Sequence, residues 1–418
     1  MKPNSIKLKC STCGTEYSVD QIEYTCPLCG PLLGTLDVIY NYTEIGRKLT
    51  KDFLRKNPVF SLWRYLPILP VSQPTMIPDL HVGWTPVYRA VKLEEKWGVR
   101  NIRIKNDGVN PTASFKDRAS AVAIVKAKEQ NVAIVTAAST GNAASSWAAF
   151  AAISGLKNII FVPKDAPRAK VAQLLIYGAE VLLVNGTYDD AFDLCCAAAE
   201  KWGWYNRSTA VNPYLAEGKK TAAFEICEQL EWEVPDYVFV PVGDGCIIQS
   251  VWKGFCEFYQ LGLITRLPKL IGVQAEGSAP LVAAWENGAS AVKPVIPKTV
   301  ADSIAVGVPR DQLKALRAVR ESGGMYIRVS DRDILSAIPL LARTTGVFAE
   351  PAAAAGLAGL RQLIDSGICK PHDTSLVLVT GNGLKDVDNA LRAVENHPIE
   401  VENTLSGVAE KLSIISNK

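Results

Sequence analysis

The sequence predicts an α/β protein in which parallel strands are covered by helices on both faces. Short runs rich in valine and isoleucine alternate along the chain with longer amphipathic runs, and turns of small residues separate them. Strands that are apolar along their whole length are typical of parallel sheets. The composition agrees with a folded enzyme, because 48% of the 418 residues are hydrophobic and 21% are charged. This length is enough for two or three domains.

Candidate strands and helices alternate along most of the chain. The expected strands are residues 132–136, 158–162, 181–184, 237–241, 270–274 and 375–380. The expected helices are residues 116–129, 143–154, 169–177, 188–202, 218–230, 247–261, 331–344, 351–365 and 384–394. A polar connector that contains several prolines spans about residues 40–86, and residues 399–418 form either a last helix or a frayed tail.

Charge and hydropathy exclude several classes of protein. Lys plus Arg number 45 and Asp plus Glu number 42, so the net charge of +3 gives no reason to expect a nucleic-acid partner. The longest charge-free stretch, residues 132–156, is polar at its centre, so we expect strand, loop and helix there rather than a membrane span. The N-terminus lacks the apolar core of a signal peptide. The three histidines have no metal-ligand spacing, so a histidine-based site is not expected.

Four of the ten cysteines have the spacing of a metal site. Cys10 and Cys13 form one C-x-x-C pair, Cys26 and Cys29 form another, and a glycine follows each pair. Each pair can direct two thiolates at one tetrahedral ion, so we expect a structural zinc site with no open coordination position. Two disulfides or four free thiols are the alternatives. The other six cysteines stand in helical or apolar surroundings, which is typical of small buried side chains.

Four loops of small residues follow expected strands or precede expected helices, where α/β proteins bind ligands. In the first loop, residues 110–118, Lys116 begins a helix directly after Phe115. Burial and the positive end of the helix dipole both disfavour the ammonium, so Lys116 is a candidate for Schiff-base chemistry as a neutral amine. The alternative is a solvated lysine in a helix start that Ser114 caps.

The second and third loops have the features of anion sites. In residues 139–142, hydroxyls and free N–H groups at a helix N-terminus suit a carboxylate, and an ordinary helix cap is the alternative. In residues 241–247, glycines let backbone N–H groups approach a phosphate. Because a carboxylate facing a phosphate is repulsive, we expect Asp244 to turn away and cap its own loop.

Together the loops resemble one enzyme family. The S-F-K-D-R run at residues 114–118 resembles the lysine motif of threonine synthases, which belong to the β family (fold type II) of pyridoxal-phosphate enzymes. The fourth loop, residues 380–386, is similar to their T-G-H-G-L-K-D run, with Asn382 in place of histidine. The resemblance covers about residues 83–386. It extends more weakly to the cysteine pairs, since some members carry a zinc-ribbon-like extension.

The resemblance implies a role for each loop. Lys116 would be the Schiff-base lysine, Asn142 would hydrogen-bond the phenolic oxygen of the cofactor, and Thr380 would meet its pyridine nitrogen. The cofactor phosphate would lie on Gly243, Asp244, Gly245, Cys246 and Ile247, where the family has Gly-Asn-x-Gly-Asn. The substrate would contact Ser139, Thr140, Gly141, Asn142, Ala143 and Lys170, which heads a Lys-x-x-Gln run of the family. Many members have threonine in place of Ala143.

The implied reaction converts O-phosphohomoserine and water to L-threonine and phosphate, which makes the enzyme a carbon–oxygen lyase acting on phosphates. The family holds the leaving phosphate partly with an Asn-Ser-x-Asn-Pro-x-Arg segment. The equivalent residues 209–215 have Ala210 and Leu215 in place of serine and arginine. An anchor of about 1.5 to 3 kcal/mol is therefore missing unless other residues replace it. Lys164, Arg168 and Lys170 are candidates, and a solvated helix start is the alternative.

Two other functions stay open. One is a related ammonia-lyase that acts on serine or threonine, or a β-replacement enzyme that uses another leaving group. The other is a non-catalytic binding or regulatory protein that keeps the fold. A lyase needs no second phosphate site, so basic side chains that converge beside the cofactor favour the synthase.

The family also implies an architecture, that of the β subunit of tryptophan synthase. It has two three-layer α/β domains with the cofactor in the cleft between them. We expect a cysteine module at residues 1–34, a large domain at residues 35–119 and 221–418, and a small domain at residues 120–220. The resemblance implies a homodimer, and we expect a cytoplasmic enzyme whose partner is an amino-acid substrate, with neither nucleic acid nor membrane as a partner.

Overall fold

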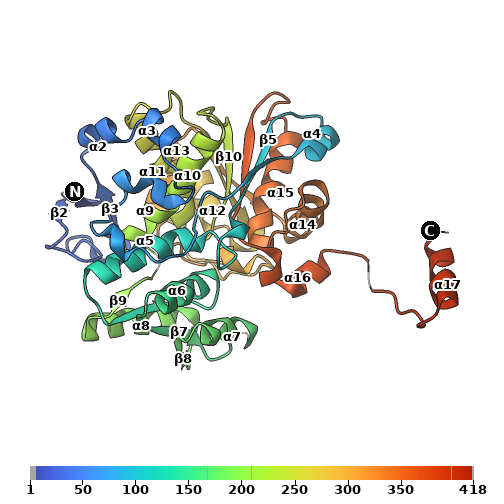
Figure 1. Cartoon of the computed structure of the whole chain (residues 1–418), viewed down its shortest axis with the longest axis horizontal. Helices are drawn as coiled ribbons and strands as arrows, with labels where there is room; N and C mark the ends of the chain where they lie inside the picture. The colour runs from blue at the N-terminus through green and yellow to red at the C-terminus, as the bar shows by residue number, and fades with distance from the viewer. Residues whose placement is uncertain (1–5, 167, 209, 397, 417–418) are drawn as a thin grey trace.

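The computed structural model describes residues 6–166, 168–208, 210–396 and 398–416, and their strands form three sheets surrounded by helices (Figure 1). The largest sheet has the strand order β12-β11-β10-β13-β5-β4, and its neighbours pair in parallel except β4 with β5. Its strands are β4 Val87–Arg89, β5 Ile102–Asn106, β10 Tyr237–Pro241, β11 Lys269–Ala275, β12 Met325–Val329 and β13 Ser375–Val379. The predicted α/β class is confirmed.

A second, fully parallel sheet lies below the first in Figure 1 and has the order β8-β7-β6-β9. Its strands are β6 Ile134–Ala138, β7 Lys157–Pro163, β8 Glu180–Val184 and β9 Tyr205–Asn206. A third, antiparallel sheet near the N-terminus has the order β2-β1-β3 and consists of β1 Lys7–Cys10, β2 Glu16–Ser18 and β3 Leu36–Ile39. The domain boundaries stay a prediction; the third sheet includes β3, which follows residue 34.

Helices surround the six-stranded and the four-stranded sheet. In the first half of the chain they are α1 Gly30–Leu33, α2 Tyr42–Lys48, α3 Lys51–Lys56, α4 Val91–Trp97, α5 Lys116–Glu129, α6 Asn142–Ile153, α7 Arg168–Ile176 and α8 Tyr188–Trp202. In the second half they are α9 Tyr214–Lys219, α10 Thr221–Gln229, α11 Cys246–Gln260, α12 Pro280–Glu286, α13 Gln312–Glu321, α14 Asp331–Thr345, α15 Pro351–Asp365, α16 Val387–Arg392 and α17 Leu405–Ser416. Short 3-10 turns are η1 Leu62–Ile68, η2 Pro74–Met76, η3 Asp107–Val109, η4 Glu276–Ser278, η5 Asp302–Ile304 and η6 Gly383–Lys385.

The largest sheet separates two hydrophobic cores because successive side chains of a strand point to opposite faces. Val238 and Val240 of β10 pack in the core that includes α10 and α11, whereas Phe239 packs in the core that includes α14 and α15. This burial on both faces explains why β10 reads as a continuous apolar run.

Most predicted elements are present, and the differences concern short or interrupted ones. The elements that were not expected are the strands β1, β2, β3, β4, β5, β9 and β12 and the helices α1, α2, α3, α4, α12 and α13. The helix expected at residues 218–230 begins earlier and is interrupted at Lys220, giving α9 and α10. The Asn212 side chain starts α9, because its carbonyl oxygen accepts a hydrogen bond from the N–H of Tyr214 at 3.0 Å.

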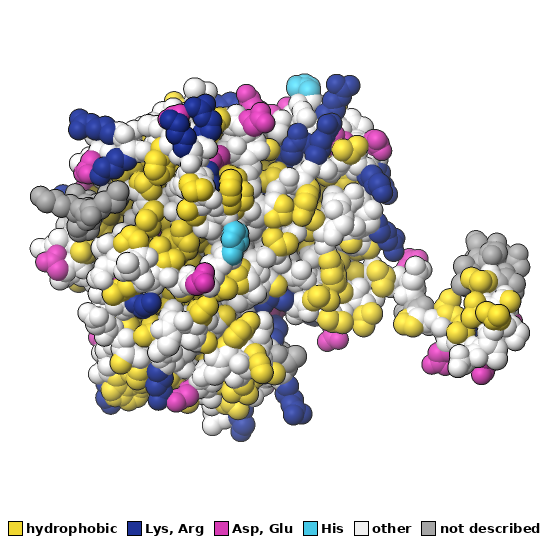
Figure 2. Space-filling view, viewed as in Figure 1, with side chains coloured by type: hydrophobic (Ala, Val, Ile, Leu, Met, Phe, Trp, Pro, Cys, Tyr) yellow, Lys and Arg dark blue, Asp and Glu magenta, His cyan; other side chains and the backbone are white. Residues whose placement is uncertain are grey.

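Of the two alternatives for residues 399–418, the structure shows a helix, α17. It lies away from the body at the end of an extended segment (Figure 1) and carries exposed apolar side chains (Figure 2), such as Leu405, which is 91% exposed. Among the described residues, no helix is both long and apolar enough to cross a membrane. The charge-free stretch 132–156 contains β6, a loop and α6, as predicted.

Residues beside the N-terminal sheet contact two elements of the rest of the chain. On one side, the Tyr24 hydroxyl accepts a hydrogen bond from the N–H of Asn206 in β9 at 2.8 Å. On the other side, the Tyr40 hydroxyl donates to the Glu217 carboxylate in α9 at 2.5 Å. The N-terminal region therefore contacts both β9 and α9, the helix that contains Leu215.

Candidate active site and cysteine cluster

A pocket of about 560 Å³ lies where the carboxyl ends of β6, β10 and β13 come together. Ligands of α/β proteins bind at such edges. The pocket brings together several of the predicted site residues with others that the sequence did not single out. Its lining includes Lys116, Asn142, Lys219, Gly243, Asp244, Gly245, Cys246, Ile247, Ser303, Glu350 and Thr380.

Lys116 is the first residue of α5 and faces this pocket. Its ammonium makes no hydrogen bond or ion pair with any residue that the structure describes. Burial, together with the positive charges of Lys219 and Arg207, lowers the pKa of Lys116 to about 8. An amine with this pKa is partly neutral near physiological pH, as nucleophilic chemistry requires.

The loop after β6 places Asn142 in the pocket at the start of α6. The Asn142 amide donates to the Glu350 carboxylate at 2.9 Å and to the Ser303 hydroxyl at 3.4 Å. The Ser139 hydroxyl accepts a hydrogen bond from the N–H of Gly141 at 3.2 Å. Neither Ser139 nor Ala143 is among the residues that line the pocket.

A second pocket of about 420 Å³ adjoins the first and shares Asn142, Ser303 and Glu350 with it. Thr140, Gly141 and Lys170 line this second pocket. Lys170 pairs with Asp302, with 2.5 Å between the ammonium nitrogen and a carboxylate oxygen, and this ion pair connects α7 to η5. Of the other basic residues considered for a phosphate, Lys164 and Arg168 are exposed and line neither pocket.

The glycine loop after β10 leaves no room for side chains at two positions. A Cβ on Gly243 would lie 3.0 Å from Val306 Cγ2, and one on Gly245 would lie 2.5 Å from Ala315 Cβ. Gly245 also has a φ of +87°, in the left-handed region that favours glycine. Within the described part of the chain, the N–H groups of residues 243–246 donate to no other residue. The loop thus offers free donors at the N-terminus of α11.

The expectation that Asp244 caps its own loop is wrong. Its carboxylate accepts a hydrogen bond from the N–H of Arg310 at 3.2 Å, and its carbonyl accepts one from the N–H of Asp311 at 3.0 Å. The segment before α13 lies against the glycine loop, which the sequence pattern did not indicate. Burial raises the pKa of Asp244, so its negative charge is disfavoured.

Thr380 and Glu350 complete the pocket from the side of β13 and α15. Thr380 directly follows β13 and is 7% exposed. Glu350 precedes α15, is 5% exposed and has a pKa raised by burial. Sequence reasoning did not single out Glu350; the available signal was a carboxylate directly before the proline that starts a helix.

Leu215 and Lys219 both lie in α9, but they differ in their relation to the pocket. Leu215 is buried and does not line it, whereas Lys219 does. The sequence analysis did not consider Lys219 as a candidate for binding phosphate. The pocket therefore contains a basic side chain beside Lys116, although the expected arginine is absent.

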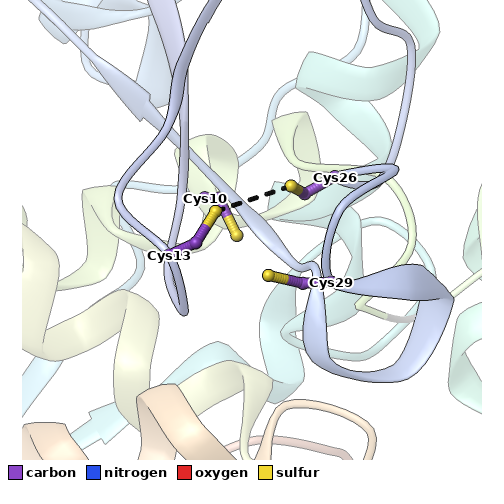
Figure 3. Close-up of side chains that lie close together, drawn as sticks. All are labelled: Cys10, Cys13, Cys26 and Cys29. Atoms are coloured by element: carbon purple, nitrogen blue, oxygen red, sulfur yellow. Dashed lines mark hydrogen bonds between the residues drawn. The ribbon is translucent and has the colours of Figure 1, made fainter.

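The four paired cysteines form one cluster, and Figure 3 shows their sulfur atoms turned towards one another. All four sulfur atoms lie within 4.8 Å of one another, and Cys13 and Cys26 are 3.7 Å apart. Gly14 and Gly30, which follow the pairs, have φ values of +76° and +73°, so the tight turns do require glycine. This set of donors suits a tetrahedral ion. All ten cysteines are free of disulfides.

A comparison with protein families finds one match, "Pyridoxal-phosphate dependent enzyme", over residues 78–381. These residues contain the pocket described above. The chain therefore belongs to the pyridoxal-phosphate-dependent enzymes, and its curated relatives narrow this class to the threonine synthases.

The threonine synthase of Methanocaldococcus jannaschii is 44% identical over 97% of this chain and 99% of its own. That of Methanosarcina acetivorans is 41% identical over 97% of this chain and 98% of its own. That of Halalkalibacterium halodurans is 40% identical over 82% of this chain and 96% of its own.

Solved structures confirm the fold. The processed form of threonine deaminase isoform 2 from Solanum lycopersicum has a TM-score of 0.65 at 23% identity and covers 80% of this chain and 92% of its own. Diaminopropionate ammonia lyase from Escherichia coli has a TM-score of 0.65 at 18% identity and covers 94% of this chain and 97% of its own. At these identities the likeness concerns the fold alone.

Proposed function

We propose that this enzyme converts O-phosphohomoserine and water to L-threonine and phosphate. The observation that carries the proposal is the basic Lys219 beside Lys116 in the pocket of a chain whose curated relatives are threonine synthases. A lyase acting on serine or threonine has no second phosphate to bind, so a second cation there has no purpose in it. The synthase needs a second cation, because its substrate carries a phosphate of its own.

The pocket fits pyridoxal 5'-phosphate as cofactor. Lys116 supplies the amine for its aldehyde, and the free N–H groups of the glycine loop 243–247 suit its phosphate. The amide of Asn142 would meet its phenolic oxygen and the hydroxyl of Thr380 its ring nitrogen. A neutral hydroxyl stabilises a protonated ring nitrogen less than a carboxylate would.

When bound, the cofactor supplies an electron sink that makes the substrate protons at Cα and Cβ removable. Lys116 accepts and returns these protons, which its pKa of about 8 permits near neutral pH. The N-terminus of α6, with Ser139, Thr140 and Gly141, holds the substrate carboxylate. Glu350 orients the Asn142 amide through their hydrogen bond. Lys170, which lines the adjoining second pocket, would contact the substrate.

The cysteine cluster would hold one structural zinc ion. Four thiolates satisfy tetrahedral zinc completely, so the ion stabilises the N-terminal sheet rather than taking part in the reaction. The mutual approach of the four sulfur atoms within 4.8 Å supports this assignment.

Three further features belong to the proposal. The units would be a module at residues 1–34, a large domain at residues 35–119 and 221–418, and a small domain at residues 120–220. The enzyme would be a homodimer and work in the cytoplasm, where free thiols such as those of the six cysteines outside the cluster persist.

The experiment is a substrate panel with wild type and Lys116→Ala. O-Phosphohomoserine, phosphoserine, threonine and serine are each supplied, and phosphate, threonine, ammonia and keto acids are measured. Phosphate and threonine from O-phosphohomoserine, abolished in Lys116→Ala, support the proposal. Ammonia or a keto acid from another substrate, with no turnover of O-phosphohomoserine, contradicts it and identifies a related lyase.

A further inference from the structure

A buried guanidinium near the active site has no partner that accounts for it. Arg207 directly follows β9 and is only 2% exposed. Its Nε and Nη2 atoms make no hydrogen bond with the described residues. An unpaired buried cation is costly, and the usual compensation is a bound anion.

The position of Arg207 in the fold places it at the ligand edge of the small sheet. β9 pairs in parallel with β6, and the N–H of Arg207 donates to the Thr136 carbonyl at 2.9 Å. The carboxyl end of β6 leads into the loop that presents Asn142 to the pocket. Arg207 therefore stands at the same strand edge as this loop.

Lys219 is a second buried cation in the same region. It is 3% exposed, lines the pocket with Lys116, and its ammonium makes no hydrogen bond or ion pair with any residue that is described. Burial lowers the pKa of both Lys219 and Arg207, and the positive charge of Arg207 also acts to lower the pKa of Lys219.

Lys219 lies one helical turn after Leu215 in α9. Residues four apart share one face of a helix, and side chains lean towards the helix N-terminus, so the Lys219 side chain leans back over position 215. The arginine that the family has at position 215 would project from this same face. A lysine at 219 can therefore deliver a positive charge to the region that this arginine serves.

No carboxylate among the described residues forms an ion pair with Lys219 or Arg207. Asp244 accepts from the backbone of Arg310, and Asp311 lies 3.5 Å from the Lys314 ammonium. The neighbouring Cys246 is held as a neutral thiol, because burial raises its pKa. Two buried cations that lack an ion-pair partner in the described part of the chain suit a bound dianion.

We propose that Lys219 and Arg207 together bind the phosphate group of the substrate, in place of the arginine replaced by Leu215. This inference rests on the proposed function, because only a substrate with its own phosphate needs this anchor. The cofactor also carries a phosphate, but the free N–H groups of the glycine loop already provide its site. The shared chemistry is a phosphate dianion, and the experiment separates its two sources.

The experiment uses holoenzymes of wild type, Lys219→Gln, Arg207→Gln and the double variant Leu215→Arg/Lys219→Gln. Wild-type threonine formation from O-phosphohomoserine is measured first, since its absence contradicts the proposed function itself. Binding of inorganic phosphate to each holoenzyme is then measured by calorimetry, and KM and kcat for O-phosphohomoserine by steady-state kinetics. Titration of each apoenzyme with pyridoxal phosphate reports cofactor affinity. Lys92→Gln, which changes an exposed lysine of α4, is the matched control.

Lys219→Gln and Arg207→Gln are expected to weaken phosphate binding and raise KM by about 10- to 100-fold each, with a smaller change in kcat and in cofactor affinity. The double variant, which moves the cation back by one helical turn, should regain at least part of the phosphate affinity that Lys219→Gln loses. A double variant with the melting temperature of wild type but no phosphate affinity would contradict the inference. Unchanged phosphate binding in both single variants overturns it, as does a loss confined to pyridoxal phosphate.

Discussion

The Asn142 amide nitrogen lies 2.9 Å from one Glu350 carboxylate oxygen and 3.2 Å from the other. This contact joins the start of α6, next to the small sheet, to the segment before α15, next to the large sheet. It crosses the pocket that contains Lys116. The orientation of Asn142 therefore depends on a residue more than two hundred positions away in the chain.

Substitution Glu350→Gln tests this dependence. It removes a charge-assisted hydrogen bond worth about 1.5 to 3 kcal/mol, so we expect kcat/KM for O-phosphohomoserine to fall about 10- to 100-fold. Steady-state kinetics measure the effect. Glu276→Gln, at an exposed carboxylate of η4, should behave like wild type. A Glu350→Gln enzyme with unchanged kcat/KM would show that Asn142 is positioned without this carboxylate.

The pKa of Lys116 predicts how cofactor uptake depends on pH. Only the neutral amine reacts, so the rate at which apoenzyme combines with pyridoxal phosphate should rise with pH through about 8 rather than about 10.5. Lys219→Gln removes a nearby positive charge, which raises the pKa of Lys116 and moves the midpoint to higher pH. Stopped-flow absorbance provides the rates. An identical midpoint in both proteins would exclude this coupling.

The buried network around Glu225 predicts a large effect on stability. The Glu225 carboxylate lies 2.6 Å from the Lys105 ammonium and 2.5 Å from the Arg118 guanidinium, and all three side chains are fully buried. Glu225→Gln removes the counter-charge of Lys105 and one of the two carboxylates that pair with Arg118, so we expect the free energy of unfolding to fall by about 3 to 5 kcal/mol. Denaturant unfolding measures it, and Glu44→Gln, in an exposed ion pair, should change it by less than about 1 kcal/mol.

The Glu225 carboxyl also makes the stability of the protein depend on pH in the acid range. Although burial opposes its ionisation, Arg118 and Lys105 lower the pKa of Glu225 to about 2. A carboxyl with a lowered pKa contributes stability above its unfolded pKa of about 4.5 and loses it as the pH falls towards 2. The stability difference between wild type and Glu225→Gln should therefore shrink from pH 5 to pH 2. A difference that is constant with pH would contradict the assignment.

Metal analysis tests the cysteine cluster. Purified protein should contain about one zinc per chain, and Cys26→Ala should lose the metal together with part of its thermal stability, because the N-terminal sheet contacts α9 and β9. Cys256→Ala, in α11 and outside the cluster, should keep its zinc. A metal-free protein with unchanged melting temperature and activity would show that the module does not need zinc.

The residues that the sequence identified share one property: each stands in a continuous motif beside a strand or helix end. Lys116 follows a turn and starts a helix, and Thr380 directly follows an apolar strand, so these local motifs, matched to those of the family, indicate both residues. The glycine loop is recognisable for the same reason, since free N–H groups at a helix start follow from chain order.

The residues that it missed reach the pocket through tertiary contacts. Arg207 follows a two-residue strand that has too little periodicity to be recognised. The sequence predicts that Lys219 lies in one helix at residues 218–230, whereas the structure begins α9 at Tyr214 and interrupts the helix at Lys220. Asp244 bonds to a segment 66 positions away, which no local pattern reports.

The most direct test follows oxygen atoms in the reaction run in water enriched in ¹⁸O. The account requires that the Cγ–O bond of O-phosphohomoserine breaks, that phosphate leaves with the ester oxygen, and that water adds at Cβ. It therefore predicts ¹⁸O in the hydroxyl of threonine, unlabelled phosphate, equal amounts of both products, and neither product with Lys116→Ala. Label in the phosphate together with homoserine would show hydrolysis at phosphorus and would contradict the account.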